Sequence, residues 1–517
     1  MTISLAIPSS PLAKLKPLEE LGRIVAGLRS KGETVVLAHG TFDLLHIGHL
    51  RHLRQAKRNG SILVVTITAD AFVNKGPGRP VFSENMRAEM LAALEFVDFV
   101  GIVHDATALP SIHAIKPSVY VKGQDYQDAK DDITGGIITE RHAVENHGGT
   151  VAFTDDITFS SSSLINRHLA VFDPTLDEFL EARRNQKSLE NFTALLDRIK
   201  DYRILMIGDA IIDDYNYVSA MGKSPKEHMI ATLFGDREVF AGGVFAAANH
   251  IADFCKEVEI ITTIGENCEY EDLIRRSLKA NVKLHAYRRP NAPTTRKARF
   301  IDKSYLRKLF EVYYMDDTPL AAELEAGIDR AIADRAAEFD AVIVTDFGHG
   351  LLSTSLIAAL RQHSKFLAVN AQSNSANMGY NLITKYASAD YICIDAPEAR
   401  LAVSDRYSDI EAIASEILPS RIDCPRVVVT HGKHGCVGYE RGKGVVHAPA
   451  FTKTVVDTVG AGDAFFAVTA PLAAAGGEMD QLTFIGNAAG AIKVGIVGHR
   501  RSVEKIPLLK FLTTLLK

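Results

Sequence analysis

DTVGAGDAFFA, residues 457–467, decides the fold of the larger part of this 517-residue chain. GAGD can form a turn that leads into a helix, and the free N–H groups at the start of such a helix bind anions. Asp463 lies at that start, where a carboxylate can accept a proton from an attacking hydroxyl while a γ-phosphoryl group is transferred. The stretch therefore predicts a phosphoryl-transfer site at the start of a helix.

Apolar, strand-like runs alternate with helix-like segments in the sequence before this stretch. The runs are RILMIGDAIID (203–213), EIITTIG (259–265), DAVIVTDFG (340–348), FLAVNAQ (366–372), DYICIDAPE (390–398) and RVVVTHG (426–432). The same alternation occurs between about Thr34 and His168, with the runs TVVLAHG (34–40), SILVVTITAD (61–70), FVDFVGIV (96–103), SVYVKG (118–123) and GTVAFT (149–154). Such alternation predicts parallel sheets with helices on both faces, and hence two α/β domains.

Residues 173–200 separate the two alternating stretches. They are charged and helix-prone and contain no strand-like run, which predicts a helical connector. The expected organisation is an N-terminal extension or helix (1–33), a doubly wound domain (34–168), a helical linker (169–199) and a second α/β domain (200–517).

HGTFDLLHIGHLRHL, residues 39–53, carries the chemistry of the first domain. A strand ends at Ala38, a glycine-containing turn follows, and a helix begins near His46. His46 and His49 are three residues apart, so they share one face of the first helical turn. Phosphates bind at such a helix start, and two imidazoles there can donate hydrogen bonds to an α-phosphate in the transition state. A zinc pair is the main alternative, but helical zinc ligands usually lie four residues apart with a glutamate beside them.

The full string G-T-F-D-x-x-H-x-G-H resembles the motif of the cytidylyltransferase-like nucleotidyltransferases. Residues 34–168 also look like the adenylyltransferase half of the bifunctional heptose kinase/adenylyltransferases, because NKGPGRPVF, Arg87, VKGQDY (121–126) and SSSSLIN (160–166) follow in order. The resemblance implies that Thr41 and Phe42 lie at the phosphate turn. It further implies phosphate-neutralising roles for Lys75, Arg79 and Lys122.

Four consecutive serines begin the last helix-like segment of this domain. Serine side chains are good N-caps, so Ser160, Ser161, Ser162 and Ser163 predict a helix start. The resemblance places that helix beneath the nucleotide, with hydroxyls and N–H groups facing phosphate. A plain helix cap without a ligand is the alternative.

D-T-x-G-A-G-D closely resembles the C-terminal motif of the ribokinase-like (PfkB) sugar kinases, and the likeness covers about residues 200–505. It implies a three-layer domain with a small β lid. Asp463 would be the catalytic base, with Gly460, Ala461 and Gly462 as donors to the phosphoryl group. The remaining sites that the resemblance implies are sugar contacts at Asp209, Asp213, Gly242, Gly243, Asn249 and Arg296, and an ATP-phosphate loop with Thr430, Gly432 and Gly435.

Two segments depart from the family pattern. The family's N-x-x-E motif, near the Mg²⁺–phosphate water network, is Asp395-Ala396-Pro397-Glu398 here. Glu398 is retained and is expected to act on Mg²⁺ indirectly, through water. The heptose kinases carry aspartate–proline–lysine where this chain has Asn370-Ala371-Gln372, so a positive charge is lost. The two halves also stand in the reverse of the familiar order.

Composition limits the class of protein. Hydrophobic residues make up 47% and charged residues 23%, with a formal net charge of −5, which is ordinary for a globular enzyme and lacks the basic excess of nucleic-acid binders. The N-terminus does not look like a secretion signal, and no apolar run approaches the ~20 residues of a membrane span. Five cysteines without a C-x-x-C pair favour thiols in a reducing compartment. We therefore expect a cytoplasmic protein without nucleic-acid or membrane partners.

The expected function is that of a bifunctional transferase. One half would phosphorylate a sugar or sugar phosphate with ATP, and the other would join a sugar 1-phosphate to a nucleotide, with Mg²⁺ needed by both. The resemblance implies an ADP-linked heptose for surface glycans and a homodimer. Three alternatives stay open: a transferase that uses CTP on a polyol or other sugar phosphate, a kinase half that only senses sugar, and a pure scaffold. The sequence leaves the sugar, the base and channelling between the sites undetermined.

Overall fold

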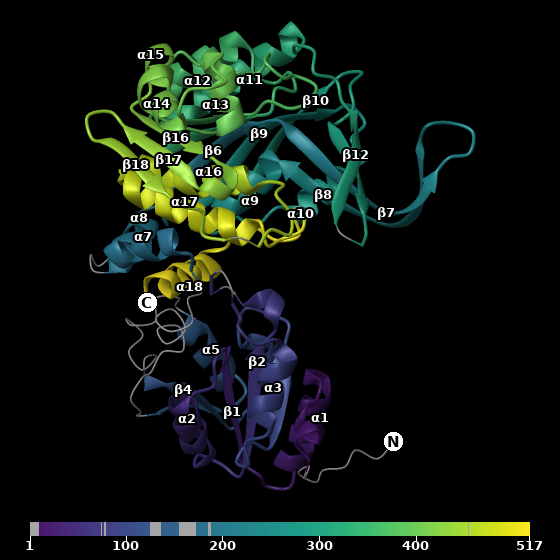
Figure 1. Cartoon of the computed structure of the whole chain (residues 1–517), viewed down its shortest axis with the longest axis vertical. Helices are drawn as coiled ribbons and strands as arrows, with labels where there is room; N and C mark the ends of the chain where they lie inside the picture. Colours follow the sequence, from purple (N-terminus) through teal and green to yellow (C-terminus); the bar gives the residue numbers. More distant parts are fainter. Residues whose placement is uncertain are drawn as a thin grey trace. The chain divides into compact units, whose positions relative to one another are not determined.

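The computed structural model describes residues 10–73, 75–76, 79–124, 136–154, 172–184, 188–304, 306–452 and 454–517. The chain divides into two compact units (Figure 1). The first comprises residues 1–184 together with 506–517, and the second comprises residues 185–505.

The first unit is built on a five-stranded parallel sheet of order β3-β2-β1-β4-β5. Its strands are β1 (Val35–Gly40), β2 (Ile62–Thr68), β3 (Phe99–Val103), β4 (Val119–Gly123) and β5 (Thr150–Thr154). Its helices are α1 (Leu18–Arg29), α2 (Ile47–Lys57), α3 (Glu84–Ala92), α4 (Leu109–Ile115), α5 (Gly136–Glu145), α7 (Pro174–Arg184) and α18 (Lys505–Leu516). The strand order reverses between β1 and β4, and ligands of doubly wound sheets bind at the carboxyl ends beside such a switch.

The central strands of this sheet are apolar on both faces. Val35 and Leu37 of β1 pack into a core with α1, α4 and α5, whereas Val36 and Ala38 pack into a second core with α2 and α3. Burial on both faces explains why the strands are continuous apolar runs.

The second unit contains a nine-stranded sheet of order β10-β9-β6-β13-β14-β15-β16-β17-β18. It is parallel from β10 to β16 and antiparallel from β16 to β18. Its strands are β6 (Arg203–Gly208), β9 (Glu257–Gly265), β10 (Val282–Arg289), β13 (Ala341–Asp346), β14 (Leu367–Ala371), β15 (Tyr391–Asp395), β16 (Arg426–Thr430), β17 (Cys436–Glu440) and β18 (Gly444–Ala448).

Helices cover this larger sheet and make it the middle of three layers (Figure 1). They are α8 (Ser188–Arg198), α9 (Val244–Ala252), α10 (Glu271–Ser277), α11 (Ala322–Arg335), α12 (Thr354–His363), α13 (Ala396–Val403), α14 (Ile410–Ala412), α15 (Leu418–Arg421), α16 (Ala461–Ala474) and α17 (Met479–Lys493). Both units thus have the mixed α/β architecture that the sequence predicts.

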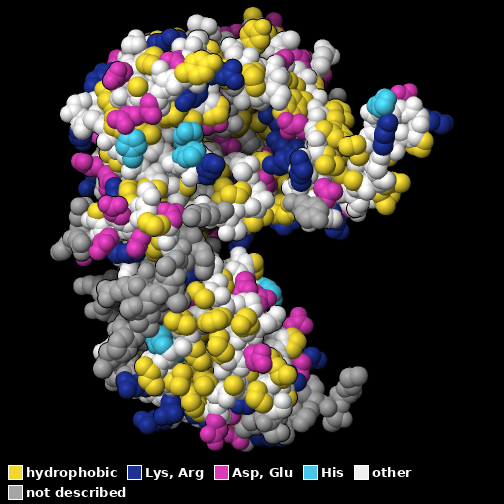
Figure 2. All heavy atoms as spheres, viewed as in Figure 1, with side chains coloured by type: hydrophobic (Ala, Val, Ile, Leu, Met, Phe, Trp, Pro, Cys, Tyr) yellow, Lys and Arg dark blue, Asp and Glu magenta, His cyan; other side chains and the backbone are white. Residues whose placement is uncertain are grey.

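A separate four-stranded sheet of order β12-β11-β7-β8 forms the lid of the second unit. Its strands are β7 (Ala210–Lys223), β8 (Ile230–Gly243), β11 (Arg296–Asp302) and β12 (Arg307–Tyr314). The tip of the β7–β8 hairpin projects from the unit and carries apolar side chains (Figure 2). Ile230, Leu233 and Phe234 are each about 60% exposed there, at 67%, 61% and 59%.

The observed division differs from the expected boundaries at three places. Leu21, Ile24 and Val25 of α1 are buried in the first core, so residues 18–29 belong to that domain and are not an extension. Residues 506–517 group with the first unit, although the sequence places them in the second domain. The expected linker contains two helices, of which α7 belongs to the first unit and α8 to the second. Among the described helices, none combines the length and apolar character needed to cross a membrane.

Candidate active sites

The first site lies at the turn between β1 and α2. His46 is the N-cap of α2, and its Nδ1 accepts a hydrogen bond from the Gly48 N–H at 3.1 Å. His49 Nδ1 accepts from the His46 N–H at 3.4 Å, and the two rings stack with centroids 4.0 Å apart. The two histidines therefore fix the start of the helix.

Both imidazoles are held neutral. Burial, followed by His46 and Lys75, lowers the pKa of His49 to about 3, and burial lowers the pKa of His46. In a neutral imidazole whose Nδ1 accepts, Nε2 carries the proton. His46 Nε2 is buried and has no hydrogen-bond partner in the described part of the chain. A phosphate oxygen is the kind of acceptor that this N–H lacks.

Arg87 stabilises the turn between β1 and α2. Its side chain is fully buried and donates to the carbonyl oxygen of Thr41 at 2.5 Å and to that of Thr68 at 2.9 Å. Phe42 has a positive φ of 48° and packs edge-on against the His49 ring, with centroids 5.1 Å apart. Thr41 and Phe42 therefore lie at the turn, and Arg87 is a positioning residue to which the sequence had given no role.

The three basic residues expected at this site have different partners. Arg79 donates to the buried carboxylate of Asp43 at 2.8 Å, and Lys122 pairs with Glu140 at 2.9 Å. Lys75 has no hydrogen bond or ion pair with any residue that the structure describes. Its charge is thus the one that these contacts leave available to an anion.

The surroundings of Lys75 are strongly cationic. Burial lowers its pKa to about 8, Asp43 opposes the shift, and Arg79, Lys517 and Lys510 add to it. An anionic ligand would relieve this repulsion between like charges. Ser160, Ser161, Ser162 and Ser163, predicted to contribute to the same site, lie outside the described residues.

The second site lies at the start of α16. Gly460 is its N-cap with a positive φ of 74°, Ala461 and Gly462 follow, and Asp463 is the third helical residue. A Cβ at Gly462 would meet no atom within 4 Å, so open space adjoins the free N–H groups of the helix. These positions form a turn at the start of a helix, as the sequence predicts.

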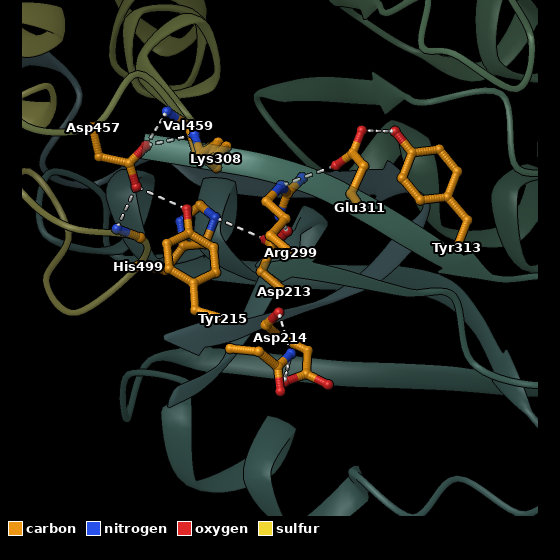
Figure 3. Close-up of polar contacts among 12 residues, drawn as sticks. Asp213, Asp214, Tyr215, Arg299, Lys308, Glu311, Tyr313, Asp457, Val459 and His499 are labelled. Atoms are coloured by element: carbon orange, nitrogen blue, oxygen red, sulfur yellow. Dashed lines mark hydrogen bonds and ion pairs between the residues drawn. The ribbon is translucent and has the colours of Figure 1, made fainter. Parts of the chain in front are cut away.

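Two buried charges hold this turn in place. Asp457 accepts hydrogen bonds from the N–H groups of Val459 at 3.1 Å and Gly498 at 2.9 Å, and also from Tyr215 and Lys308 (Figure 3). Lys493, which is fully buried, donates to the carbonyl oxygens of Val459 and Gly498. Hydrogen bonds therefore hold both an N–H group and a carbonyl oxygen of the turn in place.

Asp463 is a buried carboxylate at the start of α16. It is 8% exposed, and burial raises its pKa above the ordinary value. Gln372, at the end of β14, donates a hydrogen bond from Nε2 to its Oδ1. The residue that stands where the heptose kinases carry a lysine thus contacts Asp463 directly.

Asp213 is an ionised carboxylate near Asp463. Although burial alone would raise it, the Arg299 guanidinium and His499 hold the pKa of Asp213 well below its ordinary value. A Cβ at Gly242 would lie only 1.9 Å from Asp213 Oδ2, and Gly243 has a positive φ of 55°. Both positions therefore require glycine.

Asp209 belongs to an adjoining polar pocket, lined also by Arg289, Thr295 and His349. Its Oδ2 accepts from the N–H groups of Phe347 and His349 at 2.8 and 3.3 Å. Burial, followed by the nearby Asp346, raises its pKa to about 6.

Two predicted sugar contacts are engaged elsewhere. The Asn249 amide donates to the Ser277 carbonyl at 2.8 Å and accepts from the Lys279 N–H at 3.0 Å, so it joins α9 to the segment after α10. Arg296 pairs with Asp214 at 2.9 Å and stacks on Tyr314, which uses its charge within the lid. The polar contacts of both side chains are thus within the protein, and their contact with a sugar stays a prediction.

Lys297 and Arg299 instead supply positive charge to the cleft side of the lid. Lys297 is 6% exposed, and no hydrogen bond or ion pair joins its ammonium group to another described residue. Its ammonium lies 5.1 Å from the Tyr313 ring centroid, and burial lowers its pKa.

The Asp395–Glu398 segment concentrates carboxylates. The two side chains form a reciprocal capping box at the start of α13. Burial, then Asp395 and more weakly Asp463, raises the pKa of Glu398 to about 8. A divalent cation would compensate such a cluster, so these residues fit Mg²⁺. No three metal-ligating side chains converge within the described chain.

The predicted ATP-phosphate loop follows β16. Thr430 ends that strand, and Gly432 and Gly435 both have positive φ, at 51° and 86°. A Cβ at Gly435 would lie 1.9 Å from the Ala448 carbonyl oxygen, which explains a glycine there.

Comparison with known proteins places the second unit in a family. Residues 202–506 match the family model of the pfkB family carbohydrate kinases. The chain belongs to the pfkB family of carbohydrate kinases. Residues 37–167 match the family model described as cytidylyltransferase-like, so both matched families are transferases.

Curated proteins described as bifunctional proteins HldE are similar to parts of this chain. The chain is 37% identical over 160 residues to the bifunctional protein HldE of Syntrophotalea carbinolica, covering 30% of this chain and 31% of that protein. It is 27% identical over 319 residues to HldE of Bradyrhizobium diazoefficiens, covering 60% and 62%. The chain spans about a third of the length of the first relatives that it matches, of which HldE of Syntrophotalea carbinolica is one.

Solved structures also resemble the PfkB unit. A putative ribokinase from Agrobacterium tumefaciens is 20% identical, with a TM-score of 0.48, covering 59% of this chain and 95% of that one. Phosphofructokinase-2 from Escherichia coli with potassium is 16% identical, with a TM-score of 0.49, covering 60% and 99%.

The PfkB unit contains site residues that sequence reasoning missed. Arg299 stands three positions after the predicted Arg296, and only the strand period, which puts neighbours on opposite faces, could have favoured it. Asp457 opens the recognised motif but had no role assigned. His499 follows the motif by more than 30 residues and carries no local pattern.

Proposed function

We propose that this chain is a bifunctional sugar-activating enzyme. Its PfkB unit would transfer the γ-phosphoryl group of ATP to a sugar or sugar phosphate, at the anomeric hydroxyl. Its first unit would join a sugar 1-phosphate to a nucleoside monophosphate and release pyrophosphate. The observation that carries the proposal is the pair of anion-binding helix starts, one headed by His46 and His49 and the other by Asp463.

In the kinase step, Asp463 accepts the proton of the attacking hydroxyl as its oxygen bonds to the γ-phosphorus and the bond to ADP breaks. The N–H groups of Gly460, Ala461 and Gly462 stabilise the phosphoryl oxygens. Asp213 orients the sugar, and Lys297 and Arg299 face any phosphate that the sugar already carries. Glu398 and Asp395 would hold Mg²⁺ through water, and the ion would neutralise polyphosphate charge.

In the nucleotidyl step, an oxygen of the sugar 1-phosphate attacks the α-phosphorus of the nucleotide and pyrophosphate leaves. His46 and His49, both neutral, donate hydrogen bonds to the α-phosphate as its charge redistributes. Lys75 neutralises charge on the triphosphate or the sugar phosphate. No covalent enzyme intermediate is needed.

ATP is the nucleotide that we propose for the first unit, and a heptose is the sugar, because the chain resembles the heptose kinase/adenylyltransferases and is similar to bifunctional proteins named HldE. The product would be an ADP-linked sugar for surface glycans. CTP on a polyol or other sugar phosphate is the second candidate, favoured by the cytidylyltransferase-like match of residues 37–167.

The test is incubation of the full chain with sugars and sugar phosphates plus ATP or CTP, read by mass spectrometry. A sugar that gains one phosphate and a sugar 1-phosphate that gains AMP are expected. CMP transfer without AMP transfer would replace the adenylyl assignment. Absence of any phosphorylated sugar while sugar still binds would instead favour a sensing role for the PfkB unit.

A homodimer and a cytoplasmic location complete the proposal. The exposed apolar side chains at the tip of the β7–β8 hairpin are suited to contact a second copy of the lid. All five cysteines are free thiols, in keeping with a reducing compartment.

A further inference from the structure

His499 lies between Asp213, the carboxylate that we propose orients the sugar, and the start of α16 (Figure 3). Its Nε2 is 3.1 Å from Asp213 Oδ2, and its side chain is 7% exposed. A Cβ at Gly460 would lie 2.9 Å from the Cε1 atom of His499 and 3.6 Å from its Nδ1. The imidazole therefore fills the space between the carboxylate and the N-cap of α16.

The partner of Nε2 determines where the imidazole proton lies. Asp213 is ionised because the Arg299 guanidinium and a hydrogen bond from His499 hold its pKa well below the ordinary value, and an ionised carboxylate can only accept hydrogen bonds. Nε2 must therefore be the protonated nitrogen. In the neutral ring, Nδ1 is left as an acceptor with a free lone pair.

Nδ1 of His499 is buried and has no hydrogen-bond partner among the described residues. A buried acceptor without a donor is unfavourable, so such an atom is expected to meet a donor when the site is filled. The nearby cations are engaged: Arg299 donates to Asp213, and Lys493 donates to two carbonyl oxygens. Ionised phosphate oxygens of ATP are acceptors and cannot pair with this lone pair, whereas a sugar hydroxyl can.

We propose that His499 Nδ1 accepts a hydrogen bond from a hydroxyl group of the sugar, other than the hydroxyl that is phosphorylated. His499 is then a specificity-determining residue that links recognition by Asp213 to the phosphate turn. This inference rests on the proposed sugar-binding function of the PfkB unit. A sugar lacking that hydroxyl would leave the buried lone pair unpaired and would be rejected.

The experiment combines side-chain removal with hydroxyl removal. Wild type, His499→Leu and His499→Asn are assayed with the best sugar substrate and with its set of monodeoxy analogues. His499→Leu, and one particular deoxy analogue on the wild type, should each lower kcat/KM about tenfold. Combining the two should cause little further loss, because both remove the same hydrogen bond. His499→Asn, which can keep an acceptor, should retain more activity than His499→Leu.

The controls separate this contact from a packing role. His447→Leu removes an exposed imidazole of the same unit. It should leave kcat/KM unchanged for the sugar and for each of its deoxy analogues. If His499→Leu lowers kcat/KM by the same factor for all analogues, no hydroxyl is recognised and the inference is overturned. Calorimetric binding of the same sugars gives a readout that does not need turnover. Hydroxyl-selective loss of binding without any phosphorylation would retain the His499 contact but reject the proposed kinase reaction, and no sugar binding would reject both.

Discussion

Gln372 donates a hydrogen bond from its side-chain amide to Oδ1 of Asp463, the proposed base of the PfkB unit. This bond lowers the pKa of Asp463, whereas burial raises it. Gln372→Leu should therefore raise the pKa of Asp463 further. Because only the ionised carboxylate accepts a proton, the acidic limb of the kinase kcat/KM profile should move to higher pH. An unchanged limb would show that Gln372 does not tune the base.

Asp463→Asn should lower kcat of sugar phosphorylation by about 10²- to 10⁴-fold, because the amide cannot accept the hydroxyl proton. ATP affinity should change little. Nucleotidyl transfer by the first unit, measured on the same sample, serves as the internal control. ATP consumption that depends on sugar and is unaffected by the substitution would contradict the role of Asp463 and support sensing.

His46→Ala should lower kcat of nucleotidyl transfer by about 10²- to 10³-fold, since a donor to the α-phosphate is lost. His49, with a pKa of about 3, stays neutral down to acidic pH. The histidines should therefore produce no break in the kcat profile near pH 6.5. Such a break, absent from a His49→Asn variant, would show that His49 is protonated in the working enzyme.

Lys75 has a pKa of about 8 and loses its charge as the pH rises through that value. The KM for the substrate whose phosphate it contacts should therefore rise above about pH 8. Lys75→Arg keeps its charge in this range, so its KM should stay flat. A parallel rise in both proteins would place the titration on another group.

Gly242→Ala and Gly462→Ala form a matched pair. A methyl group at residue 242 would collide with Asp213, so that variant should lose about 1–3 kcal/mol of unfolding free energy. A methyl group at residue 462 meets open space and favours helix by up to about 1 kcal/mol. If Gly462→Ala folds well but loses kinase activity, the open space belongs to the phosphoryl group. Thermal denaturation and kinase assays distinguish these outcomes.

The sequence predicts the parts of the sites that depend on local order. Asp463 at a glycine-rich helix start and His46 at an N-cap follow from backbone geometry that neighbouring residues set. Asp213 and Gly242 were predicted from family strings, and the structure shows that they are in close contact. The partners of Arg296 and Asn249 within the protein, Asp214 and Ser277, could not be predicted, because the choice of partner depends on tertiary packing.

Long-range partners were beyond local pattern. His499 reaches Asp213 across 286 positions of sequence, and Arg87 meets Thr41 across 46. The spacing of these residues along the sequence does not indicate that they are in contact. They arise where the chain brings separate loops to the carboxyl ends of the strands.

Residues 506–517 return to the unit in which the chain begins. Lys510 donates to the Ala106 carbonyl oxygen, and Arg184 donates to that of Leu515. The PfkB match ends at residue 506, where this segment starts. A gene split after residue 184 would therefore not yield two self-sufficient products. The first fragment would lack a helix that only the second encodes, so the halves should work best as complementing pieces.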